Sequence, residues 1–333
     1  MMNYEIFKEV VAEQFLSQMP DNFAEHEVRV TSVKKVNRVE DNLHLISPEG
    51  VSMQVMPTVS LNRMYEDYQR SGNLTETLSI NASNLVKAYR EAPRDVEKKI
   101  FENASEKVIM MLINTEQNEE LLKTIPHREF QDLSIVYRLI VDIDENNIQS
   151  VMIGNGLAER LEMDEQTLYM AAVENTKCLL PPVVKSMNEV IKKMLIADGM
   201  TEDIAEMLDN DMPDDKMMYV ISNNRGINGA VSMLYENELH ALAERLENDL
   251  YLLPSSIHDI IAVPANVGNP NELAQMVAEI NMREVKLGDR LSNQVYHYDK
   301  DLRKITMATD TPNKRLDCIV AEQPLMYGIK QSR

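Results

Sequence analysis

A short polar stretch after Pro254 holds the residue types of a serine hydrolase. It contains Ser255, Ser256, His258 and Asp259. A nucleophilic serine needs a base within hydrogen-bond reach and a third group that orients the base. The stretch lacks the Gly-x-Ser-x-Gly pattern of a nucleophile elbow, and serines at a turn commonly bond to the backbone. We therefore expect a turn here, and a hydrolase that uses Ser255 or Ser256 with His258 is an alternative.

A histidine and a glutamate four residues apart form a possible pair of metal ligands. His240 and Glu244 have the i, i+4 spacing that places two side chains on one face of a helix. The His-Glu-x-x-His motif is absent, and a solvent-exposed His–Glu pair explains the spacing more simply. The chain also has no Walker A sequence and no complete dinucleotide fingerprint. We predict no metal and no cofactor.

The densest polar cluster between two apolar runs follows residue 222. It consists of Asn223, Asn224, Arg225 and Asn228. Loops held by a rigid scaffold carry a large share of binding residues. We expect a ligand site, if the chain has one, where this turn meets the turn at 254–258.

The region that carries both turns, 217–264, has the clearest pattern of secondary structure. Its helix is predicted from the apolar face formed by Leu239, Leu242, Ala243 and Leu246. Short apolar runs predict strands over 218–221, 227–234, 251–253 and 257–263. Two hairpins around one helix suit an antiparallel sheet with a helix on one face.

Helical and strand patterns also alternate through the rest of the chain, which predicts the α+β class. We expect mixed or antiparallel sheets in two parts, with helices packed on them. Helices are predicted over 3–19, 164–178 and 183–197, and strands over 28–36, 108–113, 134–143 and 148–153. Asp164 is a predicted N-cap. A last hairpin is predicted from 293–298 and 304–308.

Changes in composition divide the chain into five predicted regions. These are an N-terminal helix with a small sheet and helices (1–106), an α+β middle region (107–197), an acidic connector (198–216), a C-terminal α+β unit (217–308) and a partly ordered tail (309–333). The connector is assigned because eight acidic residues fall between Asp198 and Asp215 without a Lys or Arg.

The net charge argues against direct binding to nucleic acid. The 333 residues carry a formal charge of −20, whereas a duplex-binding protein neutralises phosphates with Lys and Arg. An acidic surface suits a basic protein partner. An acidic mimic of nucleic acid, which would block the basic groove of a partner, is a further alternative.

Cysteine use and hydropathy predict a cytoplasmic protein. Cys178 and Cys318 are far apart and have no metal-site spacing, so a reducing compartment is expected. The N-terminus lacks the apolar segment of a signal peptide, and no run of about 18 apolar residues could span a membrane. We predict no membrane partner, and the oligomeric state is open.

Four segments carry a resemblance to a known family. They are ENTKCLLPPVVKSM (174–187), YVISNNRGINGAVSMLY (219–235), LYLLPSSIHDIIAVP (250–264) and RLSNQVYHYD (290–299). In this order they resemble the bacterial family called domain of unknown function five-six-eight-eight, found in gut Firmicutes, from about Asn3 to Met307. The order is more distantly similar to the YtpQ-like family of Bacillus. The resemblance implies an intracellular α+β protein and no catalytic residues.

The incomplete catalytic motifs and the acidic charge together predict a non-enzymatic binding or interaction protein. The hydrolase and the nucleic-acid mimic are the two alternatives.

Overall fold

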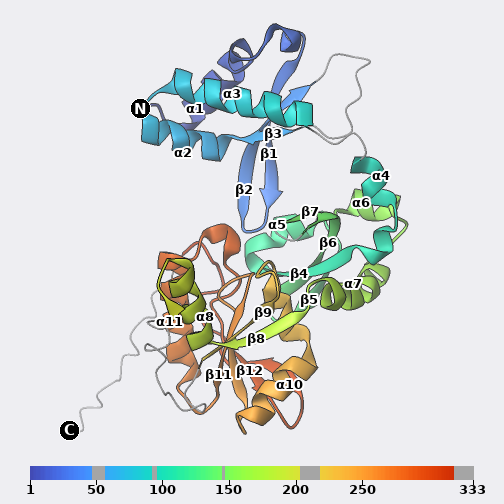
Figure 1. Ribbon diagram of the computed structural model, residues 1–333, viewed down its shortest axis with the longest axis vertical. Helices are drawn as coiled ribbons and strands as arrows, with labels where there is room; N and C mark the ends of the chain where they lie inside the picture. The colour runs from blue at the N-terminus through green and yellow to red at the C-terminus, as the bar shows by residue number, and fades with distance from the viewer. Residues whose placement is uncertain (47–56, 92–95, 145–146, 203–217, 319–333) are drawn as a thin grey trace, which may run out of the picture. The chain divides into compact units, whose positions relative to one another are not determined.

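The computed structural model describes residues 1–46, 57–91, 96–144, 147–202 and 218–318 (Figure 1). It contains two compact units, one of residues 1–107 with 139–151 and the other of 108–138 with 152–333. Helices and antiparallel sheets occur in both parts of the chain. The predicted α+β class is confirmed.

The N-terminal unit is built on a three-stranded antiparallel sheet covered by helices. Its strands are β1 (Glu27–Lys35), β2 (Arg38–Ile46) and β3 (Thr58–Ser60), in that order. Its helices are α1 (Tyr4–Gln14), α2 (Leu61–Ser71), α3 (Leu74–Glu91) and the short α4 (Val96–Phe101). Alternate residues of β2, Leu43 and Leu45, are buried with Phe7, Phe15 and Met64 in one apolar core. Burial of one strand face and one helix stripe is what their periodicities require.

A second sheet has β6 (Leu133–Ile143) at its centre. It pairs with β4 (Val108–Asn114), β5 (His127–Phe130) and β7 (Ile148–Met152). The short helix α5 (Glu119–Leu122) lies between β4 and β5 in sequence, and α6 (Asn155–Arg160) follows β7.

Helix α7 (Glu165–Leu179) supplies hydrogen bonds to the backbone of β4. The amide of Met110 donates to Thr176 Oγ1 at 2.8 Å, and Asn175 Nδ2 donates to the Val108 carbonyl at 3.1 Å. Every residue of β4 is buried, so its backbone groups need partners inside the protein.

The third sheet is six-stranded and antiparallel throughout, in the order β13-β12-β10-β11-β9-β8. Its strands are β8 (Pro182–Ser186), β9 (Tyr219–Asn223), β10 (Leu250–Leu253), β11 (Ile260–Pro264), β12 (Tyr296–Asp299) and β13 (Lys304–Met307). The helices that accompany it are α8 (Met187–Ala197), α10 (Glu236–Arg245) and α11 (Pro270–Glu284), drawn around the sheet in Figure 1.

The predicted strand over 227–234 is wrong, because most of this run is a 3₁₀-helix, Gly229–Leu234. Strand β9 pairs with β8 on one side and β11 on the other, so neither of its edges is free for a hairpin partner. Asn228 turns the chain away through a left-handed conformation, with φ +53°. The apolar run therefore packs as a helical turn.

The predicted helix over 183–197 is also wrong in its first part. Residues 182–186 form β8, and α8 begins only at Met187, after Ser186 forms a capping box with Glu189. The β-branched pair Val183-Val184 pairs with Ser222 and Ile221 of β9. Tertiary pairing has overridden the helical pattern at this point.

Other local predictions are confirmed. Helix α10 forms, β10 and β11 make a hairpin, and β12 and β13 make the last one. Asp164 caps α7 by accepting from the Thr167 amide. Strand β5 had no distinct sequence pattern and was not predicted.

The first residues of the predicted tail pack against the C-terminal unit. Gln294 Nε2 donates to the Thr311 carbonyl at 3.2 Å, and Arg290 Nη1 donates to the Leu316 carbonyl at 2.6 Å. Thr311 and Leu316 are buried. Residues 319–333 and most of the predicted connector, 203–216, lie outside the described residues, so the five predicted regions stay a prediction.

We expect Gly229→Ala to lower the free energy of unfolding by about 1 to 3 kcal/mol, as overpacking does. A Cβ atom at Gly229 would lie 2.5 Å from the His258 carbonyl oxygen and 2.8 Å from the Asn223 nitrogen. Both neighbours are backbone atoms, so neither can move aside cheaply. Urea unfolding measures the change.

Gly156→Ala is the matched control, because nothing lies within 4 Å of a Cβ at that helical position. Its stability should be unchanged or raised by up to about 1 kcal/mol. Equal stability of the two variants would contradict the close packing at Gly229.

Candidate functional site

The two turns chosen from the sequence lie against each other. The amide of Asn228 donates to His258 Nδ1 at 3.2 Å, and Ser222 Oγ donates to the His258 carbonyl at 2.7 Å. The amide of Ala230 donates to the Ile257 carbonyl at 3.2 Å. We call residues 222–229 and 254–259, with Asp289, the loop cluster.

The asparagines of the loop cluster differ in their hydrogen bonds and in their exposure to solvent. Asn223 is buried, and its side chain donates to the Ile227 carbonyl and accepts from the Arg225 amide, so it shapes the turn. The backbone amide of Asn224 donates to the Pro181 carbonyl, and the Asn224 side chain is exposed. Of the four predicted ligand residues, Asn223 and Asn228 therefore hold the loop, Arg225 is half-buried, and only Asn224 is exposed.

Both ring nitrogens of His258 face groups other than a serine hydroxyl. Nδ1 accepts from the Asn228 amide, so the proton of the neutral ring belongs on Nε2. Nε2 lies 3.6 Å from Asp289 Oδ1, and the two side chains are 35% and 42% exposed. Sequence reasoning missed Asp289, because a separation of 31 positions from His258 gives no local signal.

The serines of the predicted hydrolase site bond to the backbone instead. Ser256 Oγ accepts from the His258 amide at 3.0 Å. The Ser255 amide donates to the Leu253 carbonyl at 3.0 Å. The structure thus brings Ser256 and His258 together through the main chain, and gives neither serine the ring contact that a general base requires.

Asp259 is the residue of the loop cluster whose charge is least compensated. Burial raises the pKa of its carboxyl above the usual range, and the neighbouring His258 opposes the rise. Within the described chain, its side chain makes no hydrogen bond or ion pair. A partly buried carboxylate without a partner is costly, so Asp259 has capacity for a donor from outside the protein.

The possible metal pair, His240 and Glu244, does not gain a third ligand within the described residues. Glu244 lies 3.7 Å from Lys300, and His240 Nδ1 is buried without a hydrogen bond. The described residues hold no group of three or more His, Cys, Asp or Glu side chains that could bind a metal.

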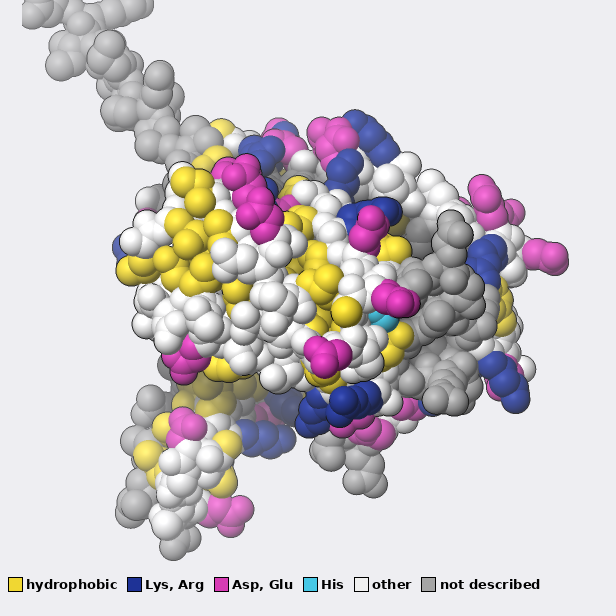
Figure 2. All heavy atoms as spheres, turned by 90° about the horizontal axis from the view of Figure 1, so that it is seen from above, with side chains coloured by type: hydrophobic (Ala, Val, Ile, Leu, Met, Phe, Trp, Pro, Cys, Tyr) yellow, Lys and Arg dark blue, Asp and Glu magenta, His cyan; other side chains and the backbone are white. Residues whose placement is uncertain are grey.

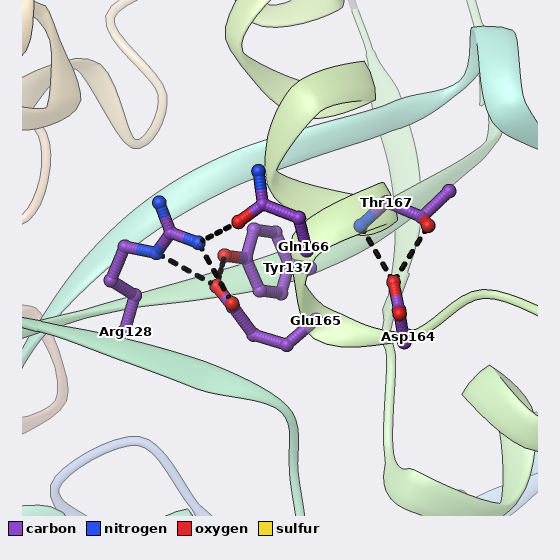
Figure 3. Close-up of polar contacts among 6 residues, drawn as sticks. All are labelled: Arg128, Tyr137, Asp164, Glu165, Gln166 and Thr167. Atoms are coloured by element: carbon purple, nitrogen blue, oxygen red, sulfur yellow. Dashed lines mark hydrogen bonds and ion pairs between the residues drawn. The ribbon is translucent and has the colours of Figure 1, made fainter.

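A charged network that sequence reasoning missed holds the start of α7 (Figure 3). Arg128 of β5 donates to both oxygens of Glu165, at 3.0 and 2.9 Å, and to Gln166 at 2.7 Å. Tyr137 of β6 donates to the same Glu165 at 2.5 Å. The guanidinium also lies over the Tyr169 ring, 3.8 Å from its centroid.

This network is closed. Burial by itself would raise the pKa of Glu165, but the hydrogen bonds from Arg128 and Tyr137 outweigh it and lower the pKa. Both oxygens of Glu165 accept from donors inside the protein, which is typical of structural ion pairs. We assign it to fixing α7 against the sheet.

A partly buried carboxylate forms another closed group. Asp132 accepts from Ser292 Oγ at 2.7 Å and from the Tyr296 hydroxyl. Burial raises the pKa of Asp132, and these hydrogen bonds oppose the rise. Unlike Asp259, this carboxylate already has partners on both oxygens.

Charges of both signs mix on the face drawn in Figure 2. Asp and Glu side chains are scattered there and often adjoin Lys and Arg, with uncharged surface between them. A mimic of nucleic acid requires a continuous acidic face, which this face does not provide.

Comparison with known families gives one match. The model described as "Family of unknown function (DUF5688)" matches residues 4–300. The chain belongs to this family. The likeness to the YtpQ-like family stays a prediction.

Membership of the DUF5688 family covers both units and the loop cluster. No curated protein and no solved structure matches the chain. None of the helices in the described ranges is both long and apolar enough to cross a bilayer.

We expect Asp259→Asn to raise the free energy of unfolding at pH 7 by about 0.5 to 2 kcal/mol. The raised pKa of Asp259 means that the folded state binds its proton more tightly than the unfolded state. The ionised carboxylate therefore costs stability above the folded pKa, and this cost disappears as the pH falls below the unfolded value.

Urea unfolding between pH 7 and the ordinary carboxyl range measures this difference. The gain of the variant over wild type should shrink as the pH falls. Asp301→Asn, at an exposed turn residue, is the control and should show little effect. A destabilised Asp259→Asn protein would mean that the carboxylate has a partner inside the fold.

Proposed function

We propose that this DUF5688 protein is a non-enzymatic interaction protein that binds a basic group of a protein partner at its loop cluster. The observation that carries the proposal is the Asp259 carboxylate, partly buried and without a partner in the described chain. A Lys or Arg side chain would supply the missing donor and charge.

The surroundings of Asp259 support a cation. Asp289 adds a second, half-exposed carboxylate 3.6 Å from His258 Nε2. The exposed Asn224 side chain adds hydrogen-bonding capacity within the loop cluster. The net charge of −20 would steer a basic partner toward the protein.

The hydrolase alternative has less support. Its base, His258, already faces the Asn228 amide and Asp289. Activity would require Nδ1, the proton-accepting nitrogen, to leave the Asn228 amide before it could take a proton from Ser255 or Ser256. Binding requires no such rearrangement.

A cytoplasmic location is part of the proposal. Cys178 and Cys318 are both free and exposed. Exposed free thiols suit a reducing compartment.

Selection from a phage-displayed random peptide library tests the proposal. Peptides that bind the full chain should carry Lys or Arg at a fixed position. Asp259→Asn should weaken those peptides by about tenfold or more, which corresponds to about 1.4 kcal/mol. Asp301→Asn, which removes the same charge from an exposed turn residue, should leave their affinity within about twofold, as surface substitutions usually do.

Selected peptides without a basic residue, or peptides that bind Asp259→Asn as tightly as wild type, would contradict the proposal. Cleavage of ester or amide probes by the purified protein, lost in His258→Ala, would favour the hydrolase instead.

A further inference from the structure

A groove in the N-terminal unit is separate from the loop cluster. It has a volume of 740 Å³ and lies between residues 17–20, which follow α1, and the C-terminal half of α3. Its polar lining is formed by Ser17, Gln18, Ser83, Lys87, Arg90 and Glu91. The volume lies within the range of small-molecule sites.

Two cations of α3 face this groove. Ser83, Lys87 and Arg90 have the i, i+4, i+7 spacing of one helix face, and all three line the groove. In the described chain neither Lys87 nor Arg90 makes an ion pair, although acidic residues exceed basic ones by 20 in the sequence. Arg90 lies in the last turn of α3, where the helix dipole favours a cation. The helix dipole gives no such reason for the charge of Lys87, which lies one turn earlier and lines the same groove.

The opposite wall is part polar and part apolar. Ser17 Oγ donates to the Gln14 carbonyl at 2.7 Å, so this turn is held in place by its own hydrogen bonds. Met19 and Pro20 supply its apolar surface, and Val86 of α3 adds apolar surface from the other wall. Glu91 also lines the groove and disfavours a ligand with many negative charges.

We propose that this groove binds an organic phosphate monoester, with the phosphate at Lys87 and Arg90 and an apolar body against Met19, Pro20 and Val86. An Arg fork beside a Lys point charge is a combination that suits phosphate oxygens. The apolar wall gives an organic ester more contact than inorganic phosphate can make.

Isothermal titration of the full chain with 1-naphthyl phosphate tests this site. We expect saturable binding at one site, tighter than binding of inorganic phosphate and of 1-naphthoate. Removal of both cations in the Lys87→Gln/Arg90→Gln variant should weaken binding at least tenfold.

The matched control is Lys35→Gln/Arg63→Gln, which removes two exposed charges of the same unit outside the groove. Its affinity should stay within twofold of wild type. If the first double variant does not fold, Ser83→Asp places a negative charge in the groove from an exposed helix position and should abolish binding.

Absence of binding would overturn the proposal, and so would equal weakening by both double variants. Equal affinity for 1-naphthoate would overturn the assignment to phosphate. The loop cluster takes no part in these measurements, so their failure leaves the proposed function untouched.

Discussion

The close approach of Gly229 to the backbone of Asn223, at the end of β9, and of His258, in the turn before β11, is the constraint on which the loop cluster depends. With no side chain, Gly229 lets the turn after β9 lie against the His258 carbonyl and the Asn223 amide. This contact places the Asn228 amide within reach of the His258 ring. The ring in turn lies between the turn and Asp289, so one small residue brings three separate segments into a single surface.

The charged groups of the C-terminal unit differ in how far their hydrogen bonding is satisfied. Glu165 and Asp132 are each held by two or more donors from other elements. The Asp259 carboxylate is partly buried and has no such donors in the described chain. Because an uncompensated carboxylate costs stability, its presence on a packed loop favours a role in binding.

Local sequence patterns predicted the elements whose neighbours agree with their own preference. The apolar face of α10 and the alternating residues of β12 and β13 are examples. The run 227–234 has a strand composition, but both edges of β9 were already paired, so it became a 3₁₀-helix. The two turns were chosen from the sequence as one candidate site, on their polar residues between apolar runs, and the structure shows that they are in contact. The sequence could not predict the contacts of Asp289, Arg128 and Glu165, because these contacts join positions far apart in the chain.

A scalar coupling across the hydrogen bond from the Asn228 amide to His258 Nδ1 would test the central claim most directly. It can be measured by NMR on the deuterated, ¹⁵N-labelled full chain. The account predicts a cross-peak that joins these two nitrogens, with the ring proton on Nε2. A His258 ring with no such coupling, together with a rapidly exchanging Asn228 amide, would show that the two turns do not form one surface.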